Sequence, residues 1–446
     1  MLDRRSLFLS LGATLTACGA DRPDGPASGA AGSERILMAQ TAPDPGLESL
    51  LPVRAAENPF APLAHALSAP PPPAARRGQA RGVESRALIL MLGDSHTAGP
   101  VMIGHLRELM QARFGAAGPG RLPPGRAQRP INANQMVEAG QTGEWVARSA
   151  LRSGNPGPFG LTGYRLTGER AGDLITLRST ETAGFDRVHL AMMAGPASGS
   201  FTLRVDGLVV GPVSLRHRAP EFRPVMLDAP RGSREIALEL VGDGPVELLG
   251  WGLERRGPGV LVEGFGINGA TLSSLDNRDP LILARELTNR PPALVILEFG
   301  TNESTDREFD EAAYAVALTR QIQRLRQTLP RSGILVMGVP DAGRPVPPPR
   351  RGRPLQGCAA VSPLPALTRV RAAQRSVAQA QRVGFFDWSA EVTRSPCRLA
   401  EMAAGAAPLM RPDLVHFTPD GYRLTAEKLH EHILRGMGMG TRVASL

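Results

Sequence analysis

Five short apolar runs, each followed by a stretch with helical character, constrain the fold of this chain more than any other feature. The runs cover residues 87–92, 260–262, 293–299, 333–339 and 383–386. The helical stretches after them include 97–114, 309–329 and 366–382. Because the runs are apolar throughout, both faces of these strands must be buried. The pattern therefore predicts an α/β fold, with a parallel sheet covered by helices on both sides.

A second pattern fills the interval 115–258, between the first and second runs. Here apolar residues alternate with polar ones, as in Phe201, Leu203 and Val205, and tight turns such as Asp206-Gly207 separate the segments. The strand-like segments are 173–178, 187–192, 200–205, 235–240 and 246–251. Alternation indicates antiparallel strands with one buried face. We therefore predict that this interval is an inserted antiparallel β-sandwich with jelly-roll character.

Residues with useful chemistry follow three of the expected elements. Ser95 comes directly after the first run, in GDSH, and Asn302 follows the run 293–299, in GTNE. Asp413 and His416 lie just before the last helix, which a Thr-Pro pair is suited to begin. A serine nucleophile needs a base within hydrogen-bond reach and donors for the oxyanion that forms. Since ligands bind at the carboxyl ends of parallel strands, we expect these residues to meet there.

Each motif alone has a simpler explanation. Gly, Asp and Ser are common turn residues, and Asn302 could cap a helix. The spacing of Asp413 and His416 recurs in Asp186 and His189, where a β pattern places residues three apart on opposite faces of a strand. The evidence lies in the combination of the three motifs, in this order and on these elements.

Together, GDSH, GTNE and DLVHFTPDGY resemble blocks one, three and five of the SGNH/GDSL hydrolase superfamily. The resemblance implies a three-layer α/β/α, flavodoxin-like domain over 87–114 and 259–446. It also implies a catalytic triad, with Ser95 as the nucleophile, His416 as the general base and Asp413 as the residue that orients His416. The sequence contains no phosphate loop, dinucleotide fingerprint or H-E-x-x-H motif, so we expect neither a cofactor nor a metal here.

The same resemblance implies an oxyanion hole formed by the N–H groups of Ser95 and Gly269 and the side-chain amide of Asn302. Block two of the family, normally a glycine after the second strand, is matched by GINGAT at 266–271. In this segment Gly269 is the better match and Gly266 the alternative. The sequence departs from the family pattern in two places. His96 stands in block one where Leu is usual, and Glu303 stands in block three where many members have Asp. Neither departure removes a catalytic group.

The β insertion between blocks one and two resembles the bacterial peptidoglycan O-acetylesterase branch, whose members carry a carbohydrate-binding-like β domain there. This resemblance implies a serine esterase that removes O-acetyl groups from a cell-wall or secreted polysaccharide. The alternatives are an SGNH-type polysaccharide O-acetyltransferase and a catalytically idle glycan-binding envelope protein. The insertion could also merely shape the rim of the active site, because few aromatic residues are present to stack on sugars, chiefly Trp145, Tyr164 and Trp251.

The first 18 residues resemble a bacterial lipoprotein signal peptide. Arg4 and Arg5 precede an apolar stretch at 7–17, which is too short to span a bilayer as a helix and which ends at Cys18. A buried N-terminal strand is the alternative, but the polar sequence after Cys18 argues against it. We expect export to the periplasm or cell envelope and lipidation of Cys18. Residues 19–86, rich in Pro, Ala and Gly, are predicted to be a disordered tether.

Cysteines and charge bear on the remaining partners. In an oxidising compartment Cys358 and Cys397 could form a disulfide, with two buried thiols as the alternative. The net charge of +9 comes almost wholly from arginines, since Lys428 is the only lysine. The arginines are scattered, with no basic helix or zinc spacing, so we expect no nucleic-acid partner. The expected partners are an acetylated polysaccharide and, through the lipid anchor, a membrane, with a monomeric catalytic unit.

Overall fold

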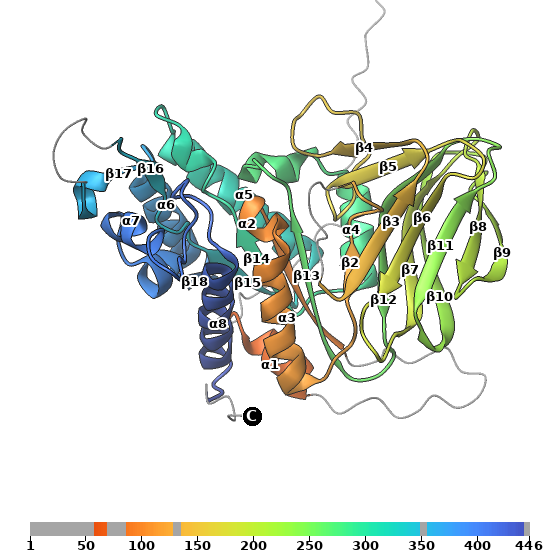
Figure 1. The fold of residues 1–446 in the computed structure, drawn as a ribbon, viewed down its shortest axis with the longest axis horizontal. Coiled ribbons are helices and arrows are strands. Elements are labelled where there is room, and N and C mark those ends of the chain that lie inside the picture. The colour runs from red at the N-terminus through yellow and green to blue at the C-terminus, as the bar shows by residue number, and fades with distance from the viewer. Residues whose placement is uncertain (1–57, 69–85, 128–134, 348–354, 441–446) are drawn as a thin grey trace, which may run out of the picture. The chain divides into compact units, whose positions relative to one another are not determined.

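A five-stranded parallel sheet, in the order β13-β1-β14-β15-β18, carries the segments that match the apolar runs (Figure 1). The computed structural model describes residues 58–68, 86–127, 135–347 and 355–440. The strands are β1 (Arg86–Gly93), β13 (Gly259–Gly266), β14 (Leu294–Glu298), β15 (Gly333–Met337) and β18 (Gly384–Phe386). Every neighbouring pair in this sheet is parallel, so the predicted sheet is confirmed.

Helices cover both faces of this sheet. Alternate residues of a strand point to opposite sides, so each strand contributes apolar side chains to both layers of helices. Ile89 and Met91 of β1 pack in one apolar cluster with α1, α3 and α8, whereas Leu90 and Leu92 pack in another with α4, α5 and α6. The helices are α1 (Ala61–Ser68), α2 (Ser95–Ala98), α3 (Pro100–Phe114), α4 (Pro280–Asn289), α5 (Glu311–Thr328), α6 (Leu367–Ala380), α7 (Leu399–Met402) and α8 (Pro419–Gly436). This is the three-layer α/β/α domain that the resemblance implies.

Shorter elements connect these layers. They are the 3₁₀ turns η1 (Leu272–Asn277), η2 (Glu303–Thr305), η3 (Gly357–Ala360) and η5 (Pro396–Arg398), the π turn η4 (Ser389–Thr393), and the paired strands β16 (Gly343–Pro345) and β17 (Val361–Pro363). A disulfide joins Cys358 in η3 to Cys397 in η5. Cys358 is exposed and Cys397 partly exposed, so these cysteines are not a pair of buried thiols.

The predicted helix 97–114 forms two helices instead of one. Gly99 is extended, with φ −70° and ψ 141°, and Pro100 begins α3 at a position where a missing N–H is harmless. The preceding helix, α2, begins at Ser95 itself. Ser95 therefore opens a short helix directly after β1.

The insertion folds into two antiparallel sheets, with strand orders β10-β7-β12-β5-β4 and β3-β6-β11-β8-β9, and β2 pairs with β12. The strands are β2 (Gly120–Leu122), β3 (Val137–Thr142), β4 (Trp145–Ser149), β5 (Tyr164–Gly168), β6 (Leu174–Ser179), β7 (Phe185–Ala194), β8 (Ser200–Val205), β9 (Leu208–Ser214), β10 (Glu221–Ser233), β11 (Glu235–Leu240) and β12 (Val246–Glu254). One apolar cluster contains Phe185 and Trp251 from the first sheet and Phe201 and Ile236 from the second. The predicted β-sandwich is confirmed.

The insertion also contributes to the core of the α/β domain. Phe159 and Leu161, between β4 and β5, belong to the cluster that holds α4, α5 and α6. The Leu161 N–H donates to Glu286 of α4 at 2.6 Å. Near the start of the insertion, Arg121 pairs with the fully buried Glu263 of β13 at 2.8 Å. The insertion is therefore joined to the α/β domain by apolar and ionic contacts.

Helix α1 lies inside the stretch 19–86 that composition predicts to be a disordered tether, and that prediction is wrong at 58–68. Phe60 and Leu63 are buried in the cluster that covers one face of the parallel sheet. Asn58 donates to the Gly436 carbonyl at the end of α8, at 2.8 Å. Two apolar side chains at helical spacing are enough to dock this short segment, although its surroundings are rich in proline.

The predicted signal peptide, with Arg4, Arg5 and Cys18, lies outside the described residues. The rest of the predicted tether, 19–57 and 69–85, lies outside them as well. Within the described ranges, every helix is too short or too polar to cross a bilayer.

Candidate active site

Ser95 lies at the carboxyl end of β1, where the strand turns directly into α2. Gly93 permits this turn, because a Cβ there would lie 2.3 Å from Thr97 Oγ1. Asp94 caps the helix, since its carboxylate accepts a hydrogen bond from the His96 N–H at 2.9 Å. Ser95 is thus held in the first turn, where its own N–H has no carbonyl partner within the helix.

Ser95, His416 and Asp413 form a continuous chain of hydrogen bonds. Ser95 Oγ lies 3.0 Å from His416 Nε2, and His416 Nδ1 lies 2.8 Å from Asp413 Oδ2. The imidazole therefore contacts a hydroxyl through one nitrogen and a carboxylate through the other. In this arrangement a histidine can take the serine proton while the carboxylate fixes its tautomer.

Hydrogen bonds keep Asp413 in its ionised form. Partial burial acts to raise the pKa of Asp413, but the His416 side chain and the backbone N–H groups of His416 and Val415 outweigh it. These N–H groups donate to Asp413 Oδ1 at 2.9 and 3.0 Å. The pKa of Asp413 consequently lies below its usual value, and the group is a carboxylate at neutral pH.

The turn that carries Asp413 and His416 has an uncommon backbone conformation. Leu414 has a φ of 56°, a left-handed value that a residue with a Cβ adopts at a cost in free energy. Its side chain is buried, and its carbonyl accepts a hydrogen bond from the Gly343 N–H at 2.9 Å. Across the same turn, the Arg411 N–H donates to the His416 carbonyl at 2.7 Å. The surroundings thus hold the turn in a shape that its own sequence disfavours.

The two glycines of block two have different structural roles. A Cβ on Gly266 would lie 2.2 Å from Ala98 N and 2.3 Å from Asp94 O, so Gly266 allows β13 to approach α2 closely. Gly269 is exposed, has a φ of 77°, and has open space where a Cβ would lie. Among the described residues, its N–H has no hydrogen-bond partner. Gly269 is therefore the glycine that can present an N–H to a ligand.

Asn302 follows β14 and bonds to the loop after β13. Its side-chain amide donates to the Ala270 carbonyl at 2.8 Å and to Asp94 Oδ2 at 3.4 Å. The second contact is long and therefore weak, so this hydrogen is available to a better acceptor. Glu303, where block three departs from the usual Asp, accepts from the Leu272 N–H at 2.7 Å. Both residues hold the loop that contains Gly269.

Two buried carboxyl groups, those of Asp94 and Glu298, lie beside the turn that carries Ser95. Burial is the main cause that raises the pKa of Asp94 to about 7. Burial, followed by the charge of Asp94, raises the pKa of Glu298 well above its usual value. Glu298 accepts from the Thr97 hydroxyl at 2.8 Å and so stabilises the turn at Ser95. Sequence reasoning did not identify Glu298, although it is the one charged residue in the run 293–299.

His96 is a buried, neutral neighbour of His416. Its Nδ1 lies 2.9 Å from Tyr422 Oη, and the centre of its ring lies 5.5 Å from that of His416. Burial first, and then the charge of His416, lower the pKa of His96 to about 3. His96 therefore adds no positive charge beside His416 near neutral pH. Tyr422 lies in the matched segment DLVHFTPDGY, but sequence reasoning gave it no role.

The second pair with this spacing, Asp186 and His189, forms no such site. Asp186 Oδ1 accepts from the Arg256 N–H at 2.6 Å, whereas His189 pairs with Glu254 at 2.8 Å. The two side chains therefore have separate partners. In the described ranges, no group of His, Cys, Asp and Glu side chains is arranged to hold a metal ion.

A family model matches part of this chain. Residues 239–424 match the family model of the GDSL-like lipase/acylhydrolase family. This range contains Gly269, Asn302, Asp413 and His416, whereas Ser95 precedes it. Among curated proteins, none matches the sequence.

One solved structure shares the fold over most of this chain. A structure described as "Peptidoglycan O-acetylesterase in action" has a TM-score of 0.65 at 24% identity, over 79% of this chain and 92% of that one. An active-site mutant of a family two carbohydrate esterase from Clostridium thermocellum has a TM-score of 0.29 at 13% identity, over 67% of this chain and 99% of that one. A salicylyl-acyltransferase from a tetracycline biosynthetic pathway has a TM-score of 0.28 at 14% identity, over 70% and 98%. Only the first likeness is close enough to support an argument, and it concerns the fold. The family match over residues 239–424 and this shared fold support a likeness to SGNH/GDSL hydrolases and, in fold, to a peptidoglycan O-acetylesterase.

Proposed function

We propose that this chain is a serine esterase that removes O-acetyl groups from a cell-wall or secreted polysaccharide, with peptidoglycan as the first candidate. The observation that carries the proposal is the pair of hydrogen bonds made by His416. Its Nε2 lies 3.0 Å from Ser95 Oγ, and its Nδ1 lies 2.8 Å from Asp413 Oδ2. The family match supports ester hydrolysis. The fold shared with a peptidoglycan O-acetylesterase supports the choice of polymer.

In the first half-reaction, Ser95 Oγ attacks the carbonyl carbon of the acetyl group while His416 Nε2 takes the hydroxyl proton. The N–H groups of Ser95 and Gly269 and the amide of Asn302 stabilise the negative charge on the carbonyl oxygen. The bond from carbon to the sugar oxygen then breaks, and His416 gives its proton to that oxygen. The sugar leaves with a free hydroxyl, and the acetyl group remains on Ser95.

In the second half-reaction, a water molecule attacks the acetyl carbon while His416 takes a proton from the water. The bond to Ser95 Oγ breaks, His416 returns the proton to Ser95, and acetate leaves. Asp413 accepts the hydrogen bond from His416 Nδ1 throughout. If a glycan hydroxyl takes the place of water, the same steps give an O-acetyltransferase, which is the alternative activity.

The test is acetate release from O-acetylated peptidoglycan, acetylated xylan and acetylated cellulose by the wild type and Ser95→Ala. We expect the wild type to release acetate fastest from peptidoglycan, and Ser95→Ala to release none above background. In a parallel reaction, an unacetylated glycan is added with an ester donor. Acetylated glycan without free acetate would identify the transferase. A folded protein that gives neither product would leave glycan binding without catalysis.

We also propose that the chain is exported and anchored through a lipid on Cys18. The support is the apolar stretch 7–17, which ends at this cysteine and is followed by a polar segment. We expect Cys18→Ala to leave the membrane fraction or to accumulate as an uncleaved precursor. A Cys18→Ala protein that is cleaved normally and stays with membranes would contradict the anchor.

A further inference from the structure

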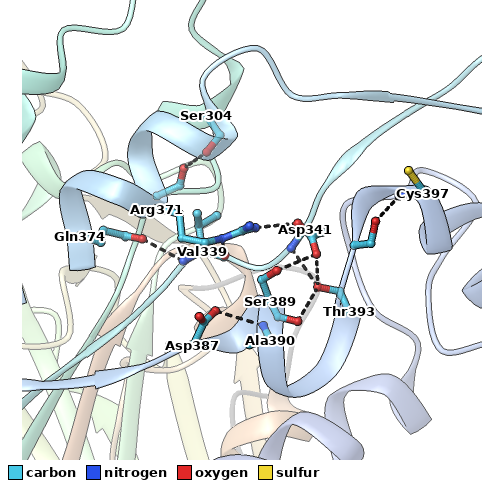
Figure 2. A network of polar contacts seen from close by, with 12 residues as sticks. Ser304, Val339, Asp341, Arg371, Gln374, Asp387, Ser389, Ala390, Thr393 and Cys397 are labelled. Atoms are coloured by element: carbon cyan, nitrogen blue, oxygen red, sulfur yellow. Dashed lines mark hydrogen bonds and ion pairs between the residues drawn. The ribbon is translucent and has the colours of Figure 1, made fainter. Parts of the chain in front are cut away.

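A buried carboxylate that the proposed mechanism does not use lies in the loop after β15 (Figure 2). Asp341 is fully buried, and its Oδ1 accepts from Arg371 Nη2 at 2.8 Å. Its Oδ2 accepts from the hydroxyls of Ser389 and Thr393, both at 2.8 Å. The Asp341 N–H in turn donates to Thr393 Oγ1 at 3.2 Å. Asp341 thus joins this loop to α6 and to η4.

The same loop is held at a second point. The Val339 carbonyl accepts from Arg371 Nε at 3.0 Å, and the Val339 N–H donates to Gln374 Oε1 at 2.9 Å (Figure 2). Arg371 and Gln374 both belong to α6. Backbone and side chain therefore fix the path of the chain from Val339 to Asp341. A buried carboxylate is unfavourable unless several donors bond to it. The bonds from Val339 and Asp341 to α6 and η4, called the clamp below, therefore favour a single geometry of this loop.

The fixed loop leads directly to the turn that carries Asp413 and His416. Gly343, two residues after Asp341, donates its N–H to the Leu414 carbonyl at 2.9 Å. Leu414 has the left-handed φ of 56° and lies between Asp413 and His416. A disfavoured backbone conformation persists only where the surrounding structure holds it. The bond from Gly343 is one such restraint, and Asp341 fixes the segment that supplies it.

We propose that Asp341 is a positioning residue for the reaction of Ser95. Through Gly343 and Leu414 it sets the orientation of the turn, and thereby the contact of 3.0 Å between His416 Nε2 and Ser95 Oγ. This inference rests on the proposed function, because it gives Asp341 a role in that reaction. A small displacement of the base lowers turnover more than substrate binding.

The main variants are Asp341→Ala and Asp341→Asn, assayed on a small aryl acetate. Asp341→Ala removes both carboxylate oxygens, which accept from Arg371, Ser389 and Thr393. We expect kcat to fall about 10- to 100-fold with KM changed less than about threefold. In Asp341→Asn the amide oxygen can accept from Arg371, and the hydroxyls can turn to accept from the NH₂ group. We expect this variant to recover kcat to within about fivefold of the wild type.

Two further variants keep the test independent of folding. If Asp341→Ala does not fold, Thr393→Val removes the hydroxyl that bonds to both the backbone and the carboxylate of Asp341. The matched control is Ser233→Ala in the insertion, which removes a hydroxyl that donates to the Pro230 carbonyl at 2.9 Å in a buried residue. We expect the control to lower the melting temperature without changing kcat.

A second readout separates this inference from the proposed function. A small alkyl fluorophosphonate labels an activated serine: the serine oxygen bonds to phosphorus, fluoride leaves and the base takes the proton. We expect Asp341→Ala and Thr393→Val to slow the labelling of Ser95 about 10-fold or more, and Asp341→Asn and Ser233→Ala to change it little.

If the wild type is labelled but releases no acetate, the proposed function fails while the positioning role is still tested by labelling. Normal labelling and kcat in a destabilised Asp341→Ala or Thr393→Val would overturn the inference. So would a well-folded Asp341→Asn as slow as Asp341→Ala, because hydrogen bonding alone would then not account for the effect.

Discussion

The α/β domain and the inserted sandwich use charged residues differently. Behind Ser95 the α/β domain buries Asp94, Glu298 and His96, and each has a pKa shifted far from its usual value. In the insertion, pairs such as Arg178 with Glu235 lie on the strand surface at 2.9 Å, with Arg178 exposed and Glu235 half-buried. Exposed pairs contribute little to stability, whereas perturbed ionisable groups gather at functional sites. This contrast supports the proposed site at the edge of the parallel sheet.

The insertion nevertheless supports that edge. Tyr164, the first residue of β5, donates its hydroxyl to the Gly266 carbonyl at 3.5 Å. Arg278 Nε donates to the Leu161 carbonyl at 3.3 Å, which ties the segment before β5 to the end of η1. Deleting the whole insertion would therefore open the core of the α/β domain. Matched pairs of point substitutions, one in each region, separate the catalytic role of the α/β domain from the supporting role of the insertion.

The largest difference between the regions is expected for two serines. Ser95→Ala should lower kcat on an aryl acetate about 10³- to 10⁶-fold, because the nucleophile is lost. Ser200→Ala in β8 removes a hydroxyl that bonds to Asp243 at 3.0 Å, and it should change kcat less than about twofold. Steady-state kinetics and melting temperatures measure both. A folded Ser95→Ala that keeps more than about a tenth of the activity would exclude Ser95 as the nucleophile.

The next effect concerns Asn302. Asn302→Ala removes one proposed donor to the oxyanion, so kcat should fall about 100- to 1000-fold with little change in KM. The bond to the Ala270 carbonyl at 2.8 Å is lost too, so the melting temperature is measured alongside. A change confined to KM would show instead that Asn302 binds the substrate in its ground state.

Substitutions of two buried phenylalanines test the core of the insertion separately from its border with the α/β domain. Phe159→Ala and Phe201→Ala should each lower the free energy of unfolding by about 3–5 kcal/mol, measured by denaturant titration. Phe159 belongs to the cluster that includes Ile267, beside block two, whereas Phe201 belongs to the sandwich core. Only Phe159→Ala should also lower kcat, by several-fold, in the folded protein. Equal kcat values for the two variants would mean that the border does not support the site.

The smallest expected effect is a change in how the melting temperature depends on pH, at Glu286 on the border between the insertion and the α/β domain. Burial is the main cause that raises the pKa of Glu286 from 4.5 to about 7. Between these values the folded protein keeps a proton that the unfolded chain has lost, so this group makes stability fall as pH rises. Glu286→Gln cannot titrate. Its melting temperature relative to the wild type should therefore be higher at about pH 8 than at about pH 4, whereas the opposite trend would contradict the raised pKa.

Apolar patterns predict the parallel sheet and much of the sandwich because they report burial directly. Strands such as 293–299 are apolar on both faces, and β8 and β11 alternate cleanly. The pattern does not predict β2 to β5, β9 or β10. Several of these strands, such as β4 and β9, leave most of their side chains exposed. Similarly, α1 has too few apolar residues to be distinguished from the proline-rich sequence around it.

The motifs lead to the residues that meet at the sheet edge, because each motif follows or precedes a recognisable element. They do not reveal the residues that hold this site in place. Glu298, Asp341 and Tyr422 come from three different elements, and their partners lie far away in the sequence. Such contacts depend on the packing of the whole domain, which no local pattern reports. For Glu298 and Asp341, the signal in the sequence is a polar residue within or just after an apolar run, whereas Tyr422 lies in the matched segment DLVHFTPDGY.

The central claim is that the acetyl group passes through Ser95. The most direct measurement is acid quenching during the first turnovers of an aryl acetate, followed by mass spectrometry of the peptides. We predict one acetyl group on the peptide that contains Ser95, no such adduct in Ser95→Ala, and slower formation in His416→Ala. Acetylation of a different residue, or acetate release that continues unchanged in Ser95→Ala, would contradict the account.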